Sequence, residues 1–296
     1  MALQNFIKSC FDRVVASDYD GPTSAHPIIV LNSLKNIIGD DRQNPSKLLL
    51  DAMAGLVERF PQRNDDQAVL DRVAKDGLGL TVFIADLEDV CQCGNPLEIE
   101  TEAARLQWVS ENGLAGIDCL IEVALQDFDR LGLFAYHLQR ANVFNQDVKN
   151  TWPHTRCLLK EIAKSPLPDP HDRIEINIDD YFSPLASCLS SLIPSLSAAK
   201  RLWGGNYVRI EGYRRELSHW FSTMSVEESL AKNMMNGLED YVKNGGKFFI
   251  GMAENFIGNP EWEAKIIQLE ALRYFAKNVS SNDLPIISSY LKELTS

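Results

Sequence analysis

The residues best suited to chemistry lie in one short stretch, ADLEDVCQC, which runs from Ala85 to Cys93. If this stretch is helical, Asp86 and Asp89 share one face, with Cys93 one turn further along. Two carboxylates in this arrangement could hold Mg²⁺, which prefers oxygen ligands. The Cys-x-Cys spacing differs from the Cys-x2-Cys pairs of zinc sites, and no second ligand pair follows it. Two interpretations stay open: a metal site at Asp86 and Asp89, or an acidic solvated face at a helix end.

A second set of polar side chains follows the helical period in YHLQRANVFNQDV, residues 136–148. Gln139, Asn142 and Gln146 are spaced so that they lie on one face of a helix. Amide side chains in such a row can bind a ligand, or they can bridge two helices. We therefore treat these three residues as candidate binding residues, with a polar helix face as the alternative.

The same run resembles the second aspartate motif of the squalene and phytoene synthase family, L-Q-x-x-N-x-x-x-D. That family is all-helical and holds Mg²⁺ on a prenyl diphosphate with two aspartate-rich motifs. The resemblance implies that Asp86 and Asp89 would form the first motif. In this chain Asn142 and Asp147 are five residues apart rather than four, which turns the aspartate away from the asparagine face.

The third stretch concentrates cations and aromatic rings in an otherwise acidic chain: KRLWGGNYVRIEGYRRELSHWF, residues 200–221. Arginine can neutralise a phosphate, and tryptophan can stack on a flat ligand. We expect a local anion site here, with Arg209, Arg215 and Trp220 as binding residues. The alternative is an exposed helix face stabilised by Glu211 and Arg215, a pair worth about 0.2–0.5 kcal/mol.

Arg214 and His219 in this stretch resemble the R-x4-H motif of HEPN-type ribonucleases, in which arginine and histidine from two paired helices cleave RNA. The resemblance implies that Arg214 and His219 are catalytic across a dimer, with the histidine as general acid or base. Here the arginine is followed by Arg215 instead of the polar residue common in that family.

The composition of the 296-residue chain is that of an ordinary globular protein, with 45% apolar and 24% charged residues. The formal net charge of −12 argues against broad nucleic-acid binding, which needs lysine and arginine on the contact face. Residues 1–150 hold 23 acidic and 13 basic side chains, whereas residues 151–296 hold 18 and 16. The acidic first half suits solubility or a basic protein partner.

The N-terminal stretch MALQNFIKSCFDRVVA carries polar residues at helical intervals, unlike a signal peptide or a membrane span. Six scattered cysteines lack the spacing of a disulfide framework, so we expect reduced, mostly buried thiols. The motifs G-x-S-x-G and G-x-G-x-x-G and the Walker A loop are absent from the sequence. These features favour a cytoplasmic protein with no membrane partner.

Most of the sequence follows the helical period, and only RIEINID, residues 173–179, alternates strictly like a strand. We expect an all-α fold: a multi-helix bundle or a helical-hairpin, solenoid-like array with at most one short extended segment. The proline-rich SPLPDPHD, residues 165–172, is the best boundary between an acidic helical lobe (1–165) and a second helical lobe (173–296). One continuous domain is the alternative.

These features predict an intracellular helical binding, scaffold or regulatory protein whose acidic N-terminal half meets a basic protein partner. The first alternative is an all-helical Mg²⁺-dependent enzyme acting on a phosphate or diphosphate, with Asp86 and Asp89 on the metal. The second is a HEPN-like ribonuclease. No cofactor is identified, and Mg²⁺ is expected only for the enzyme. The alternatives differ in whether the polar faces at residues 86–93, 139–146 and 209–220 converge in one cavity.

Overall fold

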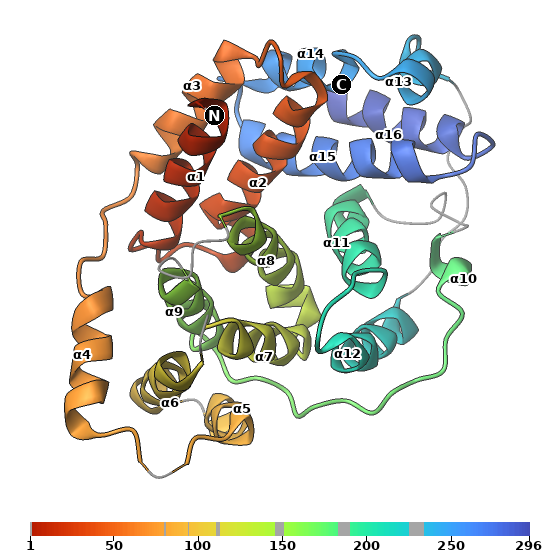
Figure 1. Cartoon of the computed structure of the whole chain (residues 1–296). Helices are drawn as coiled ribbons and strands as arrows, with labels where there is room; N and C mark the ends of the chain where they lie inside the picture. Colours follow the sequence, from red (N-terminus) through yellow and green to blue (C-terminus); the bar gives the residue numbers. More distant parts are fainter. Residues whose placement is uncertain are drawn as a thin grey trace.

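The computed structural model describes residues 2–79, 81–93, 95–110, 113–145, 151–182, 190–224 and 234–296. These residues form helices and no strand, which confirms the all-α prediction (Figure 1). Within these ranges the isolated bridge between Ser17 and Gln62 is the only pairing of strand type. None of the described helices combines the length and the apolarity needed to cross a membrane.

The helices of the first part of the chain are α1 (Ala2–Val15), α2 (Pro27–Ile38), α3 (Lys47–Val57), α4 (Asp66–Asp76), α5 (Ile84–Cys93), α6 (Pro96–Val109), α7 (Leu114–Leu125), α8 (Leu133–Asn145) and α9 (Thr151–Ile162). Those of the second part are α10 (Asp179–Phe182), α11 (Ile193–Trp203), α12 (Ile210–Thr223), α13 (Leu238–Asn244), α14 (Phe248–Phe256), α15 (Trp262–Asn278) and α16 (Leu284–Thr295). A short π-helical turn, Phe128–Gly132, precedes α8.

Side chains next to prolines start two of these helices. His26 caps α2, because its Nδ1 accepts a hydrogen bond from the Ile28 backbone N–H at 3.2 Å. Asn95 caps α6 in the same way. In both cases the following proline occupies the first helical position, where its missing N–H costs no hydrogen bond.

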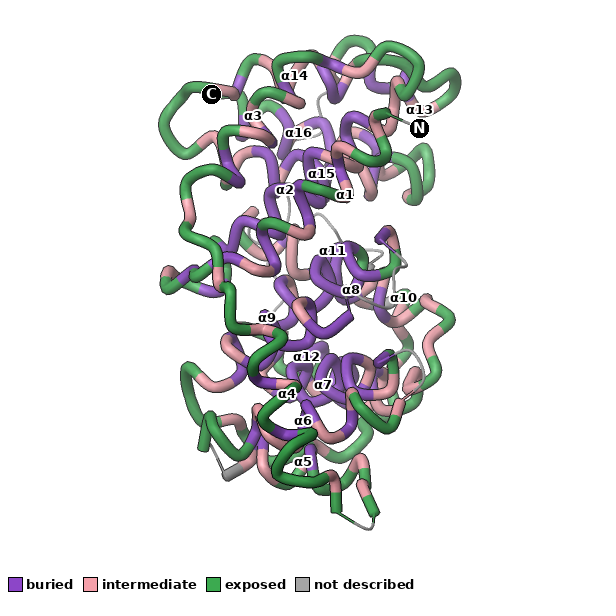
Figure 2. The backbone as a smooth tube through the Cα atoms, turned by 60° about the vertical axis from the view of Figure 1, so that its left-hand side comes forward, coloured by how far each residue is buried: buried purple, intermediate pink, exposed green. Residues whose placement is uncertain are grey.

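Four helices from distant parts of the sequence surround the centre of the molecule. α2 packs most extensively on α15 and α8, and α11 packs on the same two helices, so the four close a ring (Figure 1). The inner faces of this ring are buried and belong to one hydrophobic core (Figure 2). Helices of both predicted lobes therefore contribute to the same core, and the division at residues 165–173 stays a prediction.

The alternating segment RIEINID does not join a sheet. Residues 173–177 take no regular secondary structure and contact α12 instead: the Ile174 N–H donates to Ser218 Oγ at 2.9 Å, and Arg173 pairs with Glu211. The isoleucine alternation still has a packing role, since Ile176 and Ile178 lie against the core while Ile174 is exposed.

Candidate functional site

Two adjoining cavities lie at one end of the four-helix ring. One, of about 620 Å³, is lined by residues of α2, α8, α11 and α15 and by the loop after α11. The other, of about 650 Å³, is lined by α1, α2 and α8 with Arg273 of α15. Both cavities are lined by Asn36, Arg140 and Arg273, so they adjoin at these three residues. We call the two cavities together the cationic cleft.

Positive charge dominates the lining of the cationic cleft. Among the described lining residues, Glu270 is the one carboxylate, and the cations are Lys35, Arg42, Arg140, Arg201 and Arg273. This excess stands out in a chain whose formal net charge is −12. Aromatic rings of Tyr136, Phe144, Tyr207 and Tyr274 also line the cleft.

Arg201 is the most constrained of these cations. It forms an ion pair of 2.9 Å with Glu270, and its Nη1 donates to the Tyr136 hydroxyl at 2.8 Å. Burial alone would raise the pKa of Glu270, but the Arg201 guanidinium holds that pKa below its usual value. The Nε of Arg201 is buried and has no hydrogen-bond partner among the described residues. One donor of a buried guanidinium therefore stays unsatisfied at the cleft wall.

Arg273 is also partly neutralised. Its guanidinium binds both carboxylate oxygens of Asp40, which also accepts from Lys277 Nζ and from the Tyr241 hydroxyl. Although burial opposes it, the hydrogen bonds from Arg273 and Lys277 lower the pKa of Asp40. Asp40 is therefore an anion that offsets part of the charge of Arg273.

The other three cations of the cleft form no ion pair with any residue in the described ranges: Lys35, Arg42 and Arg140. Arg140 hydrogen bonds to the Tyr207 hydroxyl, a neutral partner. Burial lowers the pKa of Lys35 to about 8, and the nearby Arg140 guanidinium acts in the same direction. A partly buried amine such as that of Lys35 lowers the stability of the folded protein. Residues with strongly shifted pKa values of this kind are concentrated at functional sites.

Helix geometry offers a simpler reason for cations here, because Lys35 and Arg201 lie in the last turns of α2 and α11. The C-terminal end of a helix carries roughly half a negative elementary charge and attracts cations. Three such ends, from α2, α8 and α11, together offset about one and a half charges. Five cations against Glu270 and Asp40 exceed that amount, so the cleft keeps net positive charge.

Within the predicted anion site, the part at residues 209–220 has a different charge balance from the cationic cleft. Arg209 pairs with Glu88 and Glu122, and Arg215 pairs with Glu122 at 3.0 Å and with Glu216 at 2.9 Å. Two smaller cavities, of about 410 and 230 Å³, lie around this network. Because every one of these guanidinium groups already has carboxylate partners, the network leaves little free positive charge for an anion.

A glycine on α12 allows this network to form. A Cβ at Gly212 would lie 2.1 Å from the Glu122 carboxylate, so α7 and α12 approach each other where no side chain intervenes. Asp89 lines the smaller cavity together with Arg209 and Arg215. The polar faces predicted at 86–93 and 209–220 therefore converge in part, around Glu122.

The predicted catalytic pair lies on α12, but its members contact different neighbours. Arg214 donates to the Trp203 carbonyl oxygen and lies 5.8 Å from the centre of that indole ring. His219 stacks on His171, with ring centres 3.6 Å apart. Trp220 donates from its indole N–H to Asp129 at 2.7 Å and is buried. The roles of these residues in ligand binding or catalysis stay predictions.

The amide row of α8 lies apart from that network. Gln139 is buried and donates to the Tyr213 hydroxyl at 3.2 Å, and Asn142 is buried as well. Gln146 lies outside the described residues. α7 lies between α8 and α5, so Gln139 and Asn142 do not share a cavity with the acidic face of α5 (Figures 1 and 2).

Asp86 and Asp89, the predicted metal ligands, are both exposed on α5. Across the described ranges no group of three or more His, Cys, Asp or Glu side chains is close enough to hold a metal ion. A magnesium ion held by these two aspartates alone would take most of its ligands from water or from a substrate. The Mg²⁺ prediction rests on the sequence alone.

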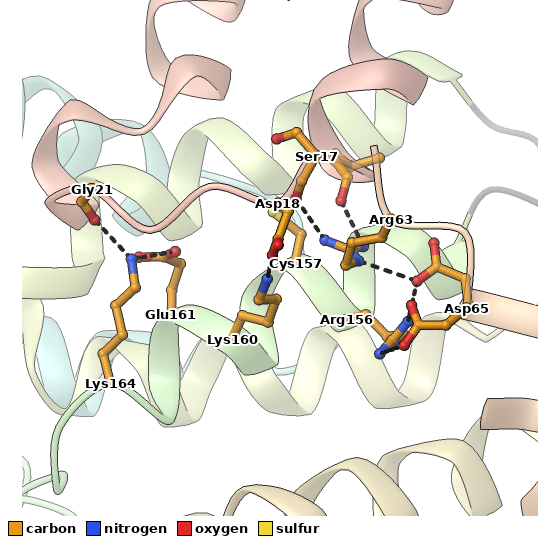
Figure 3. Close-up of polar contacts among 12 residues, drawn as sticks. Ser17, Asp18, Gly21, Arg63, Asp65, Arg156, Cys157, Lys160, Glu161 and Lys164 are labelled. Atoms are coloured by element: carbon orange, nitrogen blue, oxygen red, sulfur yellow. Dashed lines mark hydrogen bonds and ion pairs between the residues drawn. The ribbon is translucent and has the colours of Figure 1, made fainter. Parts of the chain in front are cut away.

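A further row of charged side chains lies along α9 and the turn that follows it, at residues 156, 160 and 164 (Figure 3). Arg156 binds Asp65, Asp66 and Glu100, Lys160 pairs with Asp18, and Lys164 with Glu161. Each cation of this row has an anionic partner on a neighbouring segment or helix turn. The row therefore fastens α9 to residues 16–26 and 61–66 and leaves no uncompensated charge for a ligand.

Cys157 and His26 meet beside this row, with Sγ and Nε2 3.6 Å apart, and could form a nucleophile and base. The hydrogen bonds argue against this. Because His26 Nδ1 accepts from the Ile28 N–H, the proton of the neutral ring lies on Nε2, which faces the sulfur. Burial raises the pKa of the Cys157 thiol to about 12 and lowers that of His26 to about 3. The pair is a neutral, structural contact.

Comparison of the chain with protein-family models, with curated proteins and with solved structures gives no match.

Of the cleft residues, four fall within the stretch 200–221 for which the sequence predicts an anion site: Arg201, Gly205, Asn206 and Tyr207. Arg42, Arg140 and Arg273 were missed. Their positions in the sequence are more than ninety residues apart, and no motif connects them. Among the cleft residues outside that stretch, a cation in the last turn of a helix was an available signal for Lys35 alone, and it is common in ordinary helices. Arg140 and Arg273 lie outside the last turns of α8 and α15, so no such signal marks them.

Proposed function

We propose that this protein binds a small anionic ligand, one that carries phosphate or carboxylate groups, in the cationic cleft. The observation that carries the proposal is the charge of the lining: five cations and one carboxylate among the described residues, in a protein of net charge −12. Arginine suits this task, because its planar guanidinium donates paired hydrogen bonds to phosphate or carboxylate oxygens.

The size and position of the cleft favour a small ligand over a nucleic acid. Cavities of about 620 and 650 Å³ lie in the range of small-molecule sites. A nucleic acid needs a row of cations over an extended surface, and an acidic chain would repel it outside the cleft. The proposal retains the prediction of a binding protein and specifies one class of ligand.

Calorimetric titration with inorganic pyrophosphate at low salt tests this proposal. Arg140→Gln is the informative variant, because Arg140 is exposed and has no ion pair with a described residue, so its loss leaves no carboxylate of those ranges without a partner. We expect the dissociation constant to rise by about tenfold or more, the cost of one charge-assisted hydrogen bond. Arg72→Gln, on exposed α4, is the matched control and should bind as the wild type does. Equal binding by all three proteins, or no binding at all, would reject the proposal.

A second proposal concerns the helices α5 to α7, which belong to the acidic N-terminal half for which the sequence predicted a basic partner. Five of the nine exposed large hydrophobic side chains of the described residues lie between positions 83 and 114: Phe83, Leu97, Trp108, Val109 and Leu114. Exposed carboxylates of Asp86, Asp89 and Glu98 lie in the same helices. Apolar side chains with acidic neighbours fit a basic amphipathic helix of a protein partner.

A lysine-rich amphipathic peptide tests this second proposal. Phe83→Ser and Leu97→Ser should weaken its binding, and added salt should weaken it further, because the carboxylates contribute through long-range attraction. Leu48→Ser removes another exposed leucine, from α3, and is the control. If the control weakens binding as much as Leu97→Ser does, the docking site is not on α5 to α7.

A reducing, cytoplasmic environment agrees with both proposals. Cys10, Cys91, Cys119 and Cys157 are buried free thiols. Burial raises the pKa of the Cys91 thiol to about 12, so this thiol is not poised for redox chemistry.

A further inference from the structure

Lys35 occupies an unusual position on the wall of the cationic cleft. It lies in the last turn of α2, is partly buried, and lines the cavity of about 650 Å³. Its Nζ lies 5.1 Å from the centre of the Phe144 ring and 6.0 Å from that of Phe11. The amine therefore borders the cavity from an aromatic wall.

Two other lysines of the described ranges, Lys8 and Lys277, have oxygen partners, whereas Lys265 lies over the Phe256 ring without one. Lys8 donates to the Asn145 carbonyl oxygen at 3.0 Å, and Lys277 pairs with Asp40 at 2.7 Å. Lys35 forms neither a hydrogen bond nor an ion pair with any described residue. No oxygen atom in those ranges therefore accepts a hydrogen bond from the Lys35 amine.

The charges that face Lys35 come from three packed helices. Arg140 lies on α8, Arg201 on α11, and Arg273 and Glu270 on α15. Three cations against one carboxylate favour the uncharged amine, and burial has the same, larger effect. Burial thus lowers the pKa of Lys35 to about 8, so about a quarter of the amine is neutral at pH 7.5, against about one part in a thousand for an ordinary lysine.

We propose that Lys35 is the nucleophile of the cationic cleft and that it forms an imine with an aldehyde or ketone group of the anionic ligand. This inference rests on the proposed anion binding. The arginines hold the anionic group of the ligand, and the neutral amine then lies within the same cavity as its carbonyl carbon.

The step needs no oxidant or reductant. The lone pair of Lys35 Nζ attacks the carbonyl carbon, a C–N bond forms, and the former carbonyl oxygen takes up the proton that the nitrogen releases. The carbinolamine then loses its hydroxyl group as water after a second protonation, which leaves a C=N bond. The protonated imine keeps the positive charge that the ammonium form of Lys35 would carry.

Pyridoxal 5′-phosphate is a suitable probe, because it joins an aromatic aldehyde to a phosphate. The protein is incubated with it at pH 7.5, reduced with borohydride, digested, and mapped by mass spectrometry. We expect Lys35 to be labelled at least tenfold faster than Lys8 and Lys47. Pyridoxal, which has the same aldehyde and no phosphate, should label Lys35 at least fivefold more slowly. Lys35→Arg should abolish the selective label, and Lys8→Arg should retain it.

The outcomes separate this inference from the proposed function. If pyrophosphate binds the wild type, and Lys35 reacts no faster than Lys8, the imine inference is wrong while anion binding stands. If Lys35 is labelled selectively but equally fast by both aldehydes, with no protection by pyrophosphate, the amine is reactive but the anion site is wrong. If Lys35 is labelled selectively, if pyrophosphate suppresses this labelling, and if Arg140→Gln slows it, the result supports both the anion site and the imine inference.

Discussion

Arg201 and Tyr274 form a cation–π contact on the wall of the cationic cleft, with the guanidinium carbon 4.0 Å from the ring centre. The ring of Tyr136 lies 5.4 Å from the same carbon. Two tyrosines and Glu270 therefore fix the orientation of one guanidinium. A fixed guanidinium loses little conformational entropy when it binds an anion, which is the condition for a preorganised site.

Breaking the ion pair of Arg201 and Glu270 from one side should strongly lower the free energy of unfolding. Glu270→Leu would leave the Arg201 guanidinium buried without an anion and would remove the acceptor of Asn36. We expect the free energy of unfolding to fall by about 3–5 kcal/mol in urea denaturation. The double variant Arg201→Met with Glu270→Leu should recover most of that loss. A loss below about 1 kcal/mol in the single variant would show that solvent already screens the pair.

Lys35 should destabilise the folded protein at neutral pH. Burial lowers its pKa from 10.5 to about 8, so the folded state resists protonation more than the unfolded state does. Lys35→Met should therefore raise the free energy of unfolding at pH 7 by about 1–2 kcal/mol. The difference in the free energy of unfolding between Lys35→Met and the wild type should shrink between pH 8 and pH 10.5, because in this range Lys35 is protonated mainly in the unfolded chain. Lys47→Met, at an exposed position, is the control and should change little.

Two buried histidines should make stability depend on pH. Burial lowers the pKa of His26 and of His137 from 6.5 to about 3. As the pH falls below 6.5 the unfolded state takes up protons first, so the stability present above pH 6.5 is lost progressively toward pH 3. We expect a loss of about 1.4 kcal/mol per pH unit from each histidine. Urea unfolding at pH 7, 6 and 5 measures this slope, and His137→Gln should remove about half of the histidine contribution. An unchanged slope in that variant would contradict the assignment.

Two neighbouring glycines provide a matched test of the cleft wall. A Cβ at Gly205 would lie 2.1 Å from the ring of Tyr207, whereas at Gly204 the nearest atom is the Lys200 carbonyl oxygen at 3.5 Å. Gly205→Ala must therefore displace Tyr207 and with it the hydrogen-bond partner of Arg140. We expect pyrophosphate affinity to fall several-fold in Gly205→Ala and to stay unchanged in Gly204→Ala. Equal effects would mean that Tyr207 does not shape the site.

The helical fold could be predicted because its signals are local. Apolar residues at helical spacing and capping side chains identify helices without knowledge of their partners. The alternation in RIEINID was less informative, because a strand needs a neighbouring strand to pair with. Ile176 and Ile178 do pack against the core, but the backbone N–H of Ile174 donates to the Ser218 side chain instead of to a strand.

The candidate site could be predicted only in part, because charge balance depends on long-range contacts. The sequence offers Arg209 no carboxylate partner and offers Arg215 only Glu211, yet Glu88 and Glu122, about ninety or more residues away, neutralise the two arginines. Conversely, Arg140 lies in a stretch in which the sequence predicts amide side chains as the binding residues. Only the fold brings Arg140 next to Arg201 and Arg273. Sequence spacing describes one helix face at a time and cannot give the net charge of a cavity built from four helices.

The most direct test of the account is a crystal structure of the protein soaked in tungstate, a tetrahedral dianion that resembles phosphate and gives a strong anomalous signal. We predict an anomalous peak in the cationic cleft, within hydrogen-bond distance of Arg140 and of Arg201 or Arg273. Peaks confined to other surfaces, such as the network around Arg209, or no peak at all would contradict the central claim that this cleft is an anion site.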